Sequence, residues 1–501
     1  MSETLIPLSS LVRPAPAARL RSTMGPHTVT LTSSCIDCAV CVDVCPQRVF
    51  SVEAGRRHLA VPRSGDCLGL EACTACVEAC PVPGAIAITA STSWACLGDR
   101  RWTNELLTAA HHAAEHGVMP APLAGRETQL GDAGGGFDRL RFRFPPPGST
   151  TGSTARAINP ADVDLRVPLN RRADGRAALA LALPVYGGGM SYGSVSLNIM
   201  LARAMAARAL GTFTCTGEGG YPEPLVPYAD VVIAQVATGL FGVREETLQR
   251  APIVEFKYAQ GAKPGLGGHL LADKVSPSVA FVRDTVPGSS LFSPFPFHSV
   301  YSVEDHKKHV DWVKTINPRA LIAVKVSTPD DIDMVAVGAF YAGAHIIHLD
   351  GGYGGTGAAP EIAKKNIAMP IEFAIGKTHA FLMAEGVRDQ VTLIASGGLR
   401  SAHDVLKAIA LGADACVIGT AELVAVECVR CGNCESGRGC PLGIATTDVH
   451  LTPLIEAAWG AQRIINLYAA WETEWRAVLA RLGLPGIAAL RGRTDLLEYL
   501  P

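Results

Sequence analysis

Eight of the 15 cysteines lie between residues 35 and 80, and no other feature limits the fold of this chain so strongly. They form two runs, each followed by a proline: Cys35, Cys38, Cys41 and Cys45 precede Pro46, and Cys67, Cys73, Cys76 and Cys80 precede Pro81. The first residues contain no apolar core of a secretory signal, so we expect a cytoplasmic location. Clustered cysteines in a reducing compartment are rarely disulfides, and zinc sites do not favour two runs that both end in Cys-Pro. The pattern therefore predicts thiolate ligands of iron–sulfur clusters.

The spacing within the two runs is similar to that of bacterial two-cluster ferredoxins. The first run has two, two and three residues between its cysteines, and the second has five, two and three. In such proteins the last cysteine of one run binds the cluster of the other run. Residues 25–95 therefore resemble a ferredoxin domain that holds two [4Fe–4S] clusters and transfers electrons. The resemblance implies one ligand set of Cys35, Cys38, Cys41 and Cys80, and a second set of Cys67, Cys73, Cys76 and Cys45.

The charge of the chain gives no reason to expect a nucleic-acid or membrane partner. Charged residues make up 18% of the sequence and the formal net charge is −2, so no basic excess is available for phosphates or lipid headgroups. The most apolar stretch, residues 408–426, contains Asp414 and Glu422. It therefore predicts a buried helix and strand, and not a membrane span.

The region from residue 96 to about 180 carries weaker signals. Residues 102–116 favour a helix, whereas residues 131–137 and 145–153 are rich in glycine, proline and serine and favour breaks. We interpret this region as a connecting arm that lies on the next domain.

From about residue 181 to the end, apolar strands alternate with helical patterns. Such alternation predicts an α/β fold, and eight strands favour a (β/α)8 TIM barrel. The spacing is uneven across residues 260–320, so a doubly wound sheet fits the pattern as well. The predicted strands are 181–186, 212–216, 231–236, 253–259, 321–326, 345–350, 391–396 and 415–419.

Three glycine-rich loops follow the last three predicted strands. They comprise residues 350–357, 395–400 and 418–421. Barrel enzymes place their chemistry at this end of the strands, and glycines let backbone amides approach a phosphate or a flat ring. Three such loops favour a phosphate-bearing cofactor, and FMN suits a protein that already handles electrons.

Several motifs in this region resemble the FMN-binding synthase domain of glutamate synthases. The resemblance covers residues 180–500 in family order, and the ferredoxin-like start is similar to the compact, archaeal-type form of the family. It implies an FMN barrel with an iron–sulfur cluster that reduces 2-iminoglutarate to L-glutamate. The matching segments are 189–194, 216–220, 259–265, 299–305, 354–358, 396–400, 440–446 and 492–497.

The resemblance also implies roles for individual residues. Lys263 and Arg283 match positions that hold the carboxylates of 2-oxoglutarate, and two cations suit a dicarboxylate. Glu218 is expected to assist proton or ammonia handling. Lys325, at a strand end, is expected to stabilise an anionic flavin. The residues expected around FMN are Met190, Ser191, Glu218, Gln235, Lys325, Gly354, Gly355, Ser396, Gly397, Gly398, Gly419 and Thr420.

A third group of cysteines lies at residues 428–440. Cys428, Cys434 and Cys440 keep the frame of the family's [3Fe–4S] site with one extra residue, and Cys431 adds a fourth thiol. The site is therefore expected to hold a [3Fe–4S] cluster, or a [4Fe–4S] cluster with Cys431 as the extra ligand. We favour the three-iron form because three positions match.

Two parts of the larger family members have no counterpart in this sequence. The glutaminase of those proteins uses a cysteine nucleophile, and no cysteine precedes Cys35 here; nor does a β-helix follow the barrel. We expect separate subunits to supply these functions, or free ammonia or an amine to serve. The electron donor is expected to be a ferredoxin or a pyridine-nucleotide reductase.

Two substitutions near the substrate motifs leave the reaction open. His269 stands where the family has glutamine, and Tyr353 where it has aspartate. The leading interpretation is the catalytic subunit of a glutamate synthase. The alternatives are the large subunit of an N-methylglutamate synthase, and an electron-transfer subunit with FMN but no substrate chemistry.

Overall fold

The N-terminal domain is built from a two-stranded sheet and two short helices. The computed structural model describes residues 25–53, 55, 58–120, 136–145, 158–172, 174–435 and 437–500, so the predicted breaks at 131–135 and 146–153 lie outside the described residues. Strand β1 (His27–Leu31) pairs antiparallel with β2 (Ile86–Ala90). Helices α1 (Val40–Val44) and α2 (Ala75–Ala79) end at Cys45 and Cys80, which both take an extended conformation. The proline that follows each cysteine disfavours the helical region for the residue before it, so the two Cys-Pro pairs end the two helices.

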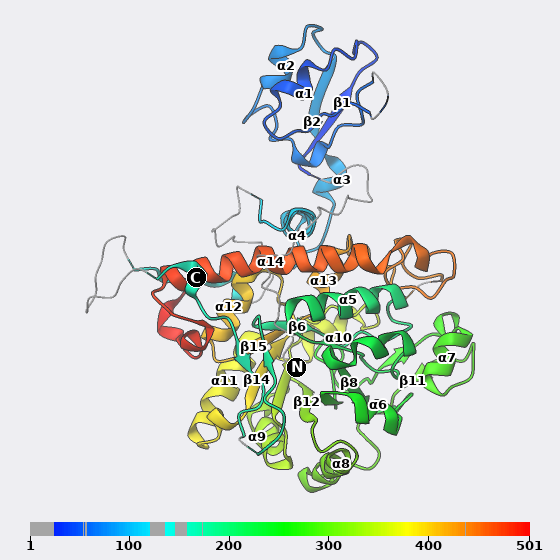
Figure 1. The fold of residues 1–501 in the computed structure, drawn as a ribbon, viewed down its shortest axis with the longest axis vertical. Helices are drawn as coiled ribbons and strands as arrows, with labels where there is room; N and C mark the ends of the chain where they lie inside the picture. Colours follow the sequence, from blue (N-terminus) through cyan, green and yellow to red (C-terminus); the bar gives the residue numbers. More distant parts are fainter. Residues whose placement is uncertain are drawn as a thin grey trace.

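A helical arm leads from this domain to the barrel. It contains α3 (Thr92–Ala95) and α4 (Asn104–His116), and the second agrees with the helix predicted over residues 102–116. The Thr103 side chain caps α4 by accepting from the Leu106 amide. Helix α4 packs on the long helix α14 (Ala457–Arg481), where Asn466 donates to the carbonyl oxygens of Ala114 and Glu115 at 3.0 and 3.1 Å. The arm and α14 therefore separate the N-terminal domain from the barrel (Figure 1).

Eight parallel strands close into a barrel. Each strand pairs in parallel with its neighbours, and the last pairs with the first, in the order β12-β13-β14-β15-β6-β7-β8-β9. Closure confirms the predicted (β/α)8 fold and excludes the doubly wound sheet, which has open edges. The strands are β6 (Val185–Gly187), β7 (Thr214–Cys215), β8 (Val232–Ala237), β9 (Ile253–Lys257), β12 (Leu321–Ser327), β13 (Ile346–Asp350), β14 (Thr392–Ser396) and β15 (Ala415–Ile418).

The first predicted strand, residues 181–186, is wrong in one respect. Leu181 belongs to β5 (Ala180–Leu181), which pairs antiparallel with β4 (Val167–Pro168) outside the barrel. The barrel strand β6 begins only at Val185, after Pro184. Pro184 has no amide hydrogen to donate to a ladder, so it divides one apolar run into two strands with different partners.

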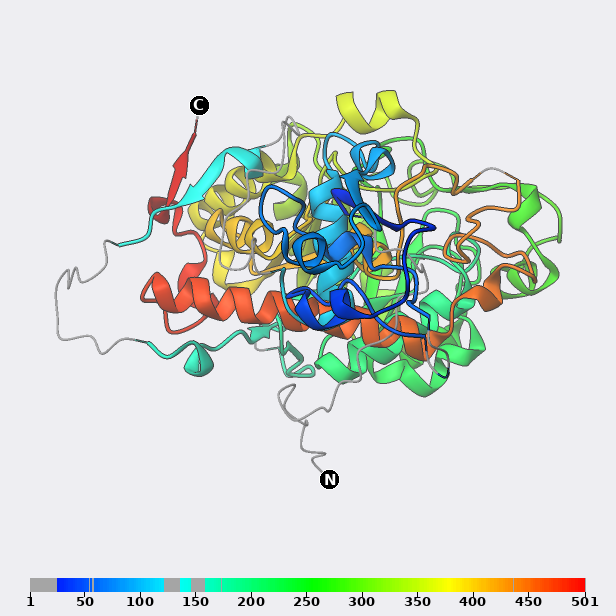
Figure 2. The same cartoon turned by 90° about the horizontal axis from the view of Figure 1, so that it is seen from above.

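Helices surround the barrel, and two further small strand pairs join β4–β5 outside it among the described residues. In both views the N-terminal domain lies on the side of the barrel that carries α4 and α14 (Figures 1 and 2). Among the residues that the structure describes, no helix has both the length and the apolar character needed to cross a membrane. The helices are α5 (Leu197–Leu210), α6 (Glu245–Arg250), α7 (Pro277–Arg283), α8 (Val303–Ile316), α9 (Ile332–Ala342), α10 (Glu361–Asn366), α11 (Ile371–Ala384), α12 (Ala402–Ala410) and α13 (Thr420–Ala425); the pairs are β10 (His269–Leu270) with β11 (Leu291–Phe292), and β3 (Leu140–Phe142) with β16 (Leu497–Tyr499).

A buried carboxylate joins three distant segments at the amino-terminal end of two barrel strands. Asp414, directly before β15, accepts from Arg171 at 2.9 Å, from Arg388 at 2.8 Å and from Arg491 at 3.2 Å. It also accepts from the amide of Leu393, in β14, at 2.8 Å. Only 1% of its side chain is exposed. These contacts fix the segments around Arg171 and Arg491 to the end of the barrel that lies away from the strands' carboxyl ends.

Candidate active site and cysteine clusters

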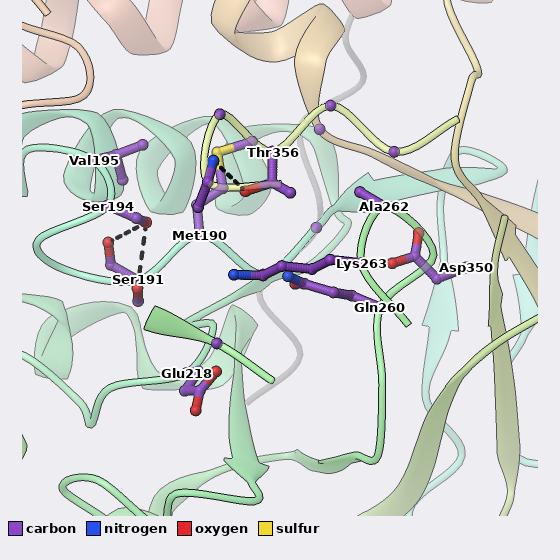
Figure 3. Close-up of a pocket in the computed structure, with 18 of the residues that line it drawn as sticks. Met190, Ser191, Ser194, Val195, Glu218, Gln260, Ala262, Lys263, Asp350 and Thr356 are labelled. Carbon is purple, nitrogen blue, oxygen red and sulfur yellow. Dashed lines mark hydrogen bonds between the residues drawn. The ribbon is translucent and has the colours of Figure 1, made fainter. Parts of the chain in front are cut away.

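A cavity of about 270 Å³ lies at the carboxyl ends of the barrel strands. The side chains of Lys263 and Gln260 lie side by side in it, with Glu218 and Ser191 on the same side of the cavity (Figure 3). The structure brings together in this one cavity every residue predicted for the cofactor or for catalysis. These are Met190, Ser191, Glu218, Gln235, Lys263, Arg283, Lys325, Gly354, Gly355, Ser396, Gly397, Gly398, Gly419 and Thr420.

The glycines of the predicted loops allow close approach of backbone to a ligand. A side chain at Gly355 would begin 2.1 Å from the Thr420 hydroxyl oxygen, so a larger residue there would force the Thr420 side chain to move. Gly397 and Gly398 have φ angles of +94° and +92°, which residues other than glycine rarely adopt. The walls formed by these residues suit a phosphate and a flat ring, which is the shape and chemistry of FMN.

Polar side chains from neighbouring strands form a network at the base of the cavity. The Lys325 ammonium lies 3.1 Å from the Asp350 carboxylate, which also accepts from the Ser396 hydroxyl at 2.6 Å. Burial alone would lower the pKa of Lys325, but the charges of Asp350 and Glu255 raise it. Lys325 therefore keeps a positive charge at the base of the cavity.

Glu255 is a buried site residue that sequence reasoning missed. Its carboxylate accepts from the Gln235 amide at 2.6 Å and pairs with His348 at 2.9 Å, and 1% of the residue is exposed. Burial would raise its pKa, but the hydrogen bond and charge of His348 and the charge of Lys325 lower it to about 2. A charged residue in the middle of the apolar segment 253–257 is the signal that marks it. Gln235 is thus held from below by a group that stays ionised.

The two predicted substrate cations are both buried. Lys263 is 3% exposed, and its ammonium lies 3.2 Å from His269. Arg283 is 4% exposed and donates to the Ser191 hydroxyl and the Tyr192 carbonyl at 2.9 Å each. Its Nε has no hydrogen-bond partner among the described residues. This buried donor therefore remains available to an acceptor that is not part of the chain.

Burial also changes the proton affinity of these cations. Burial and then repulsion from Lys257 lower the pKa of Lys263 to about 8. Burial lowers the pKa of Arg283 to about 10, against the attraction of Glu218. Both shifts show that positive charge is held here at a cost, which a bound dianion would offset.

Glu218 faces the same cavity and is held in place by two side chains. Its carboxylate pairs with Lys257 at 3.0 Å and accepts a hydrogen bond from Ser293. Lys257 was also missed, although it follows Glu255 by two residues and therefore points to the same side of β9. The cavity wall thus provides two cations, Lys263 and Arg283, that can bind carboxylates, and one carboxylate, Glu218, that can bind an amine.

The cysteines of the N-terminal domain gather around two separate cavities. Each cavity is lined by four cysteines, three from one run and one from the other, and apolar side chains such as Phe50 and Ile86 complete the walls. Four thiols in an apolar shell are the donor set of a [4Fe–4S] cluster. The first set is Cys35, Cys38, Cys41 and Cys80, and the second is Cys45, Cys67, Cys73 and Cys76.

Replacing Cys80 by alanine is expected to remove the cluster of the other run. Cys80 lies in the second run but lines the cavity of Cys35, Cys38 and Cys41. Iron analysis should show a loss of about four irons per chain, with the second cluster retained. The matched control is Cys96→Ala, because Cys96 is exposed and lies outside both cavities. Loss of all iron from Cys80→Ala, or of none, would contradict the ligand sets.

The third group of cysteines lies next to the barrel cavity. Cys434 lines the cavity, and Gly357 gives it room because a side chain there would begin 2.8 Å from its Cβ. Cys428 and Cys434 are half-buried and Cys440 is buried, whereas Cys431 is exposed. The three family-matched thiols therefore share the interior side of this loop.

Substituting Cys431 by serine is expected to leave the third cluster in place. The exposed position of Cys431 favours a three-iron site held by the other cysteines of the loop. Anaerobically prepared Cys431→Ser protein should keep the EPR signal of an oxidised [3Fe–4S] cluster, and Cys434→Ser should lose it. A [4Fe–4S] signal that disappears in Cys431→Ser would sink the three-iron interpretation.

Comparison with known proteins agrees with both parts of the chain. Residues 158–485 match the conserved region in glutamate synthase, and residues 34–84 match the 4Fe-4S dicluster domain. The archaeal-type glutamate synthase (NADPH) of Dehalococcoides mccartyi is 36% identical over 478 residues, which cover 91% of this chain and 92% of that protein. The archaeal glutamate synthase (NADPH) of Methanocaldococcus jannaschii is 43% identical over 321 residues, 64% of this chain and 63% of that protein.

More distant similarities are shorter or weaker. The glutamate synthase (NADPH) large chain of Azospirillum brasilense is 36% identical over 318 residues, which are 62% of this chain but 21% of that protein. The match over residues 158–485 and the 36% identity along nearly the whole chain decide the assignment. The chain belongs to the glutamate synthase family of oxidoreductases and carries an N-terminal 4Fe-4S dicluster domain.

Proposed function

We propose that this chain is the catalytic subunit of a glutamate synthase, which reduces 2-iminoglutarate, formed from 2-oxoglutarate and ammonia, to L-glutamate. The observation that carries the proposal is the pair of buried cations, Lys263 and Arg283, in the cavity with three glycine-rich loops. A dicarboxylate is the ligand that two buried cations favour. An electron relay without a substrate has no use for such a pair, which argues against the electron-transfer alternative.

The proposed cofactors are FMN, two [4Fe–4S] clusters and a third iron–sulfur cluster. FMN, when bound, supplies the hydride that reduces the C=N bond. The loops around Gly354, Gly397 and Gly419 would hold its phosphate and ring, and the side chains of Met190 and Gln235 would complete the site. Lys325 would place its positive charge at the base of the cavity, where negative charge on a bound ring is stabilised.

The chain's own residues would bind and orient the substrate. Lys263 and Arg283 would each hold one carboxylate, and Arg283 has an unpaired Nε–H to donate. Glu218, held by Lys257 and Ser293, would accept a hydrogen bond from the amine nitrogen and hold its proton.

The partners are proposed from the same chemistry. The substrates are 2-oxoglutarate and ammonia or an amine, with separate glutaminase-like and β-helix subunits as partners. Electrons would reach the N-terminal clusters from a ferredoxin or a pyridine-nucleotide reductase. The names of the relatives from Dehalococcoides mccartyi and Methanocaldococcus jannaschii include NADPH, which favours the second donor.

An anaerobic reoxidation assay tests the proposal. The holoprotein is photoreduced, 2-oxoglutarate is added with ammonium or with methylamine, and the flavin spectrum is followed. Reoxidation with ammonium supports glutamate synthase, and reoxidation with methylamine alone supports N-methylglutamate synthase. If neither amine reoxidises the flavin even with partner subunits present, the synthase proposal is wrong.

The substrate affinity is expected to fall as pH rises through about 8. Burial, and then Lys257, lower the pKa of Lys263 to about 8, so its ammonium is present below this pH and lost above it. A carboxylate binds the charged form, so kcat/KM for 2-oxoglutarate should be flat below pH 8 and fall about tenfold per unit above it. Lys263→Arg keeps its charge and should lose this fall. A wild-type profile that stays flat to pH 10 would contradict the role of Lys263.

A further inference from the structure

The arm between the two domains contributes to the wall of the barrel cavity. Trp102 lies just before α4, is 4% exposed, and lines the same cavity as Gly398 and Thr420. The guanidinium of Arg101 stacks on the ring of Tyr353 at 3.4 Å, and the Tyr353 side chain lies against Gly398. The arm therefore meets the loops that follow β13, β14 and β15, which are the loops proposed for the flavin phosphate.

Arg430 lies where this arm, the cysteine loop and the glycine loops come together. Its Nε and Nη2 donate to the Asp99 carboxylate of the arm at 3.0 and 2.6 Å. Its Nη1 lies 3.7 Å from the point where a side chain at Gly355 would begin, and the Thr420 hydroxyl oxygen lies 2.1 Å from the same point. No hydrogen bond joins Nη1 to any residue that the structure describes.

The backbone of Arg430 is also unusual. Its φ angle is +56°, in the left-handed region that is unfavourable for residues other than glycine. A non-glycine residue held in this conformation is strained, and such residues cluster at functional sites. The conformation is therefore consistent with a side chain that must point in a fixed direction.

We propose that Arg430 binds the phosphate of FMN through Nη1, and that Asp99 holds the guanidinium in position, so that the arm completes the phosphate end of the flavin site. This inference rests on the FMN site of the proposed function. The planar guanidinium can serve both partners at once, because Asp99 occupies one edge and leaves Nη1 for a phosphate oxygen.

Trp102 shields one side of the Arg430 guanidinium, and 22% of the Arg430 side chain stays exposed. Its ring lies 5.9 Å from the Arg430 guanidinium and is buried against the cavity wall. An ion pair between a guanidinium and a phosphate is stronger where solvent is excluded. The segment that carries the ferredoxin-like domain is thus part of the flavin site, and not only a tether.

Flavin titrations of the apoprotein test the proposal. The full chain is depleted of flavin, and FMN or riboflavin is added while flavin fluorescence is measured. Arg430→Gln should raise the Kd of FMN about 10- to 100-fold and leave the Kd of riboflavin unchanged, because riboflavin has no phosphate. Asp99→Asn should raise the Kd of FMN by a smaller factor and likewise spare riboflavin.

The controls separate this role from a structural one. Arg438 lies in the same cysteine loop and pairs with Asp448 at 2.6 Å, but its side chain is 63% exposed, so Arg438→Gln should leave both Kd values unchanged. Iron analysis shows whether the third cluster is retained; if Arg430→Gln loses it, Asp99→Asn, which leaves the cysteine loop unaltered, decides the matter. Equal weakening of FMN and riboflavin, or no weakening of FMN, overturns the inference. Failure of the wild-type protein to bind FMN would instead overturn the proposed function.

Discussion

Replacing Lys263 by alanine is expected to lower kcat/KM for 2-oxoglutarate about 30- to 150-fold, because a buried ammonium bound to a carboxylate contributes roughly 2 to 3 kcal/mol. Lys263 is 3% exposed and its ammonium lies 3.2 Å from His269. The measurement is the rate of flavin reoxidation at low 2-oxoglutarate with saturating ammonium. The loss should appear mainly in KM if Lys263 binds ground state and transition state alike, and in kcat if it also orients the reacting carbon.

A lysine remote from the cavity supplies the control. Lys308 on α8 has a side chain that is 77% exposed, so Lys308→Ala should leave the rate unchanged. The Lys263→Ala protein should also keep its flavin and iron, since Lys263 is assigned to the substrate and not to the cofactors. Activity within threefold of wild type in Lys263→Ala would show that the dicarboxylate is bound elsewhere.

Replacing Asp414 by alanine is expected to destabilise the barrel by about 3 to 5 kcal/mol, the usual effect of removing one partner from a buried ion pair. The carboxylate accepts from three arginines and from the Leu393 amide, and Arg388 is itself 1% exposed. Without Asp414 the buried Arg388 would lose its carboxylate partner, with the partly exposed Arg171 and Arg491 beside it. Asp414→Asn should be affected less, because the amide oxygen still accepts hydrogen bonds.

The matched control uses a second partner of one of these arginines. Asp389 pairs with Arg491 at 2.6 Å, but its side chain is 76% exposed, so Asp389→Ala should change stability by less than about 1 kcal/mol. Far-UV circular dichroism during urea unfolding measures both changes. Similar midpoints for Asp414→Ala and Asp389→Ala would mean that the buried cluster does not hold the barrel ends together.

The sequence predicts the parts of this protein that follow local rules. Cysteine spacing leads to the sorting of Cys45 and Cys80 into opposite sets because tight turns around a cluster leave few geometries. The apolar strands and the glycines after them lead to the barrel and to the face of its cavity. These local rules fail at Pro184. The apolar run on both sides of it looks like one strand in the sequence, but it forms β5 and β6, which pair with different strands.

The contacts that the sequence does not predict are made between distant segments. Nothing near Trp102 in the sequence indicates that it lines a cavity with Thr420, because the packing of α4 on α14 and α13 places it there. Glu255 and His348 are different, since each is a charged or polar residue inside an apolar strand. Such a residue needs a buried partner. Because successive side chains of a strand point to opposite faces, its position in the strand indicates that the partner lies inside the barrel.

The core of the N-terminal domain has a consequence for assembly. Its buried apolar residues among those described are few, and two of the seven are thiols: Val29, Cys41, Val49, Phe50, Cys76, Ala85 and Ile86. A core of this size does not hold a domain together without disulfides, metals or other cross-links. Because each proposed iron–sulfur cluster would join residues from both halves of the domain, the clusters would hold the domain together as well as carry electrons. We therefore expect iron shortage or oxidative loss of the clusters to leave an unfolded N-terminal tail on an intact barrel, a species that proteases would trim before it could misdirect electrons.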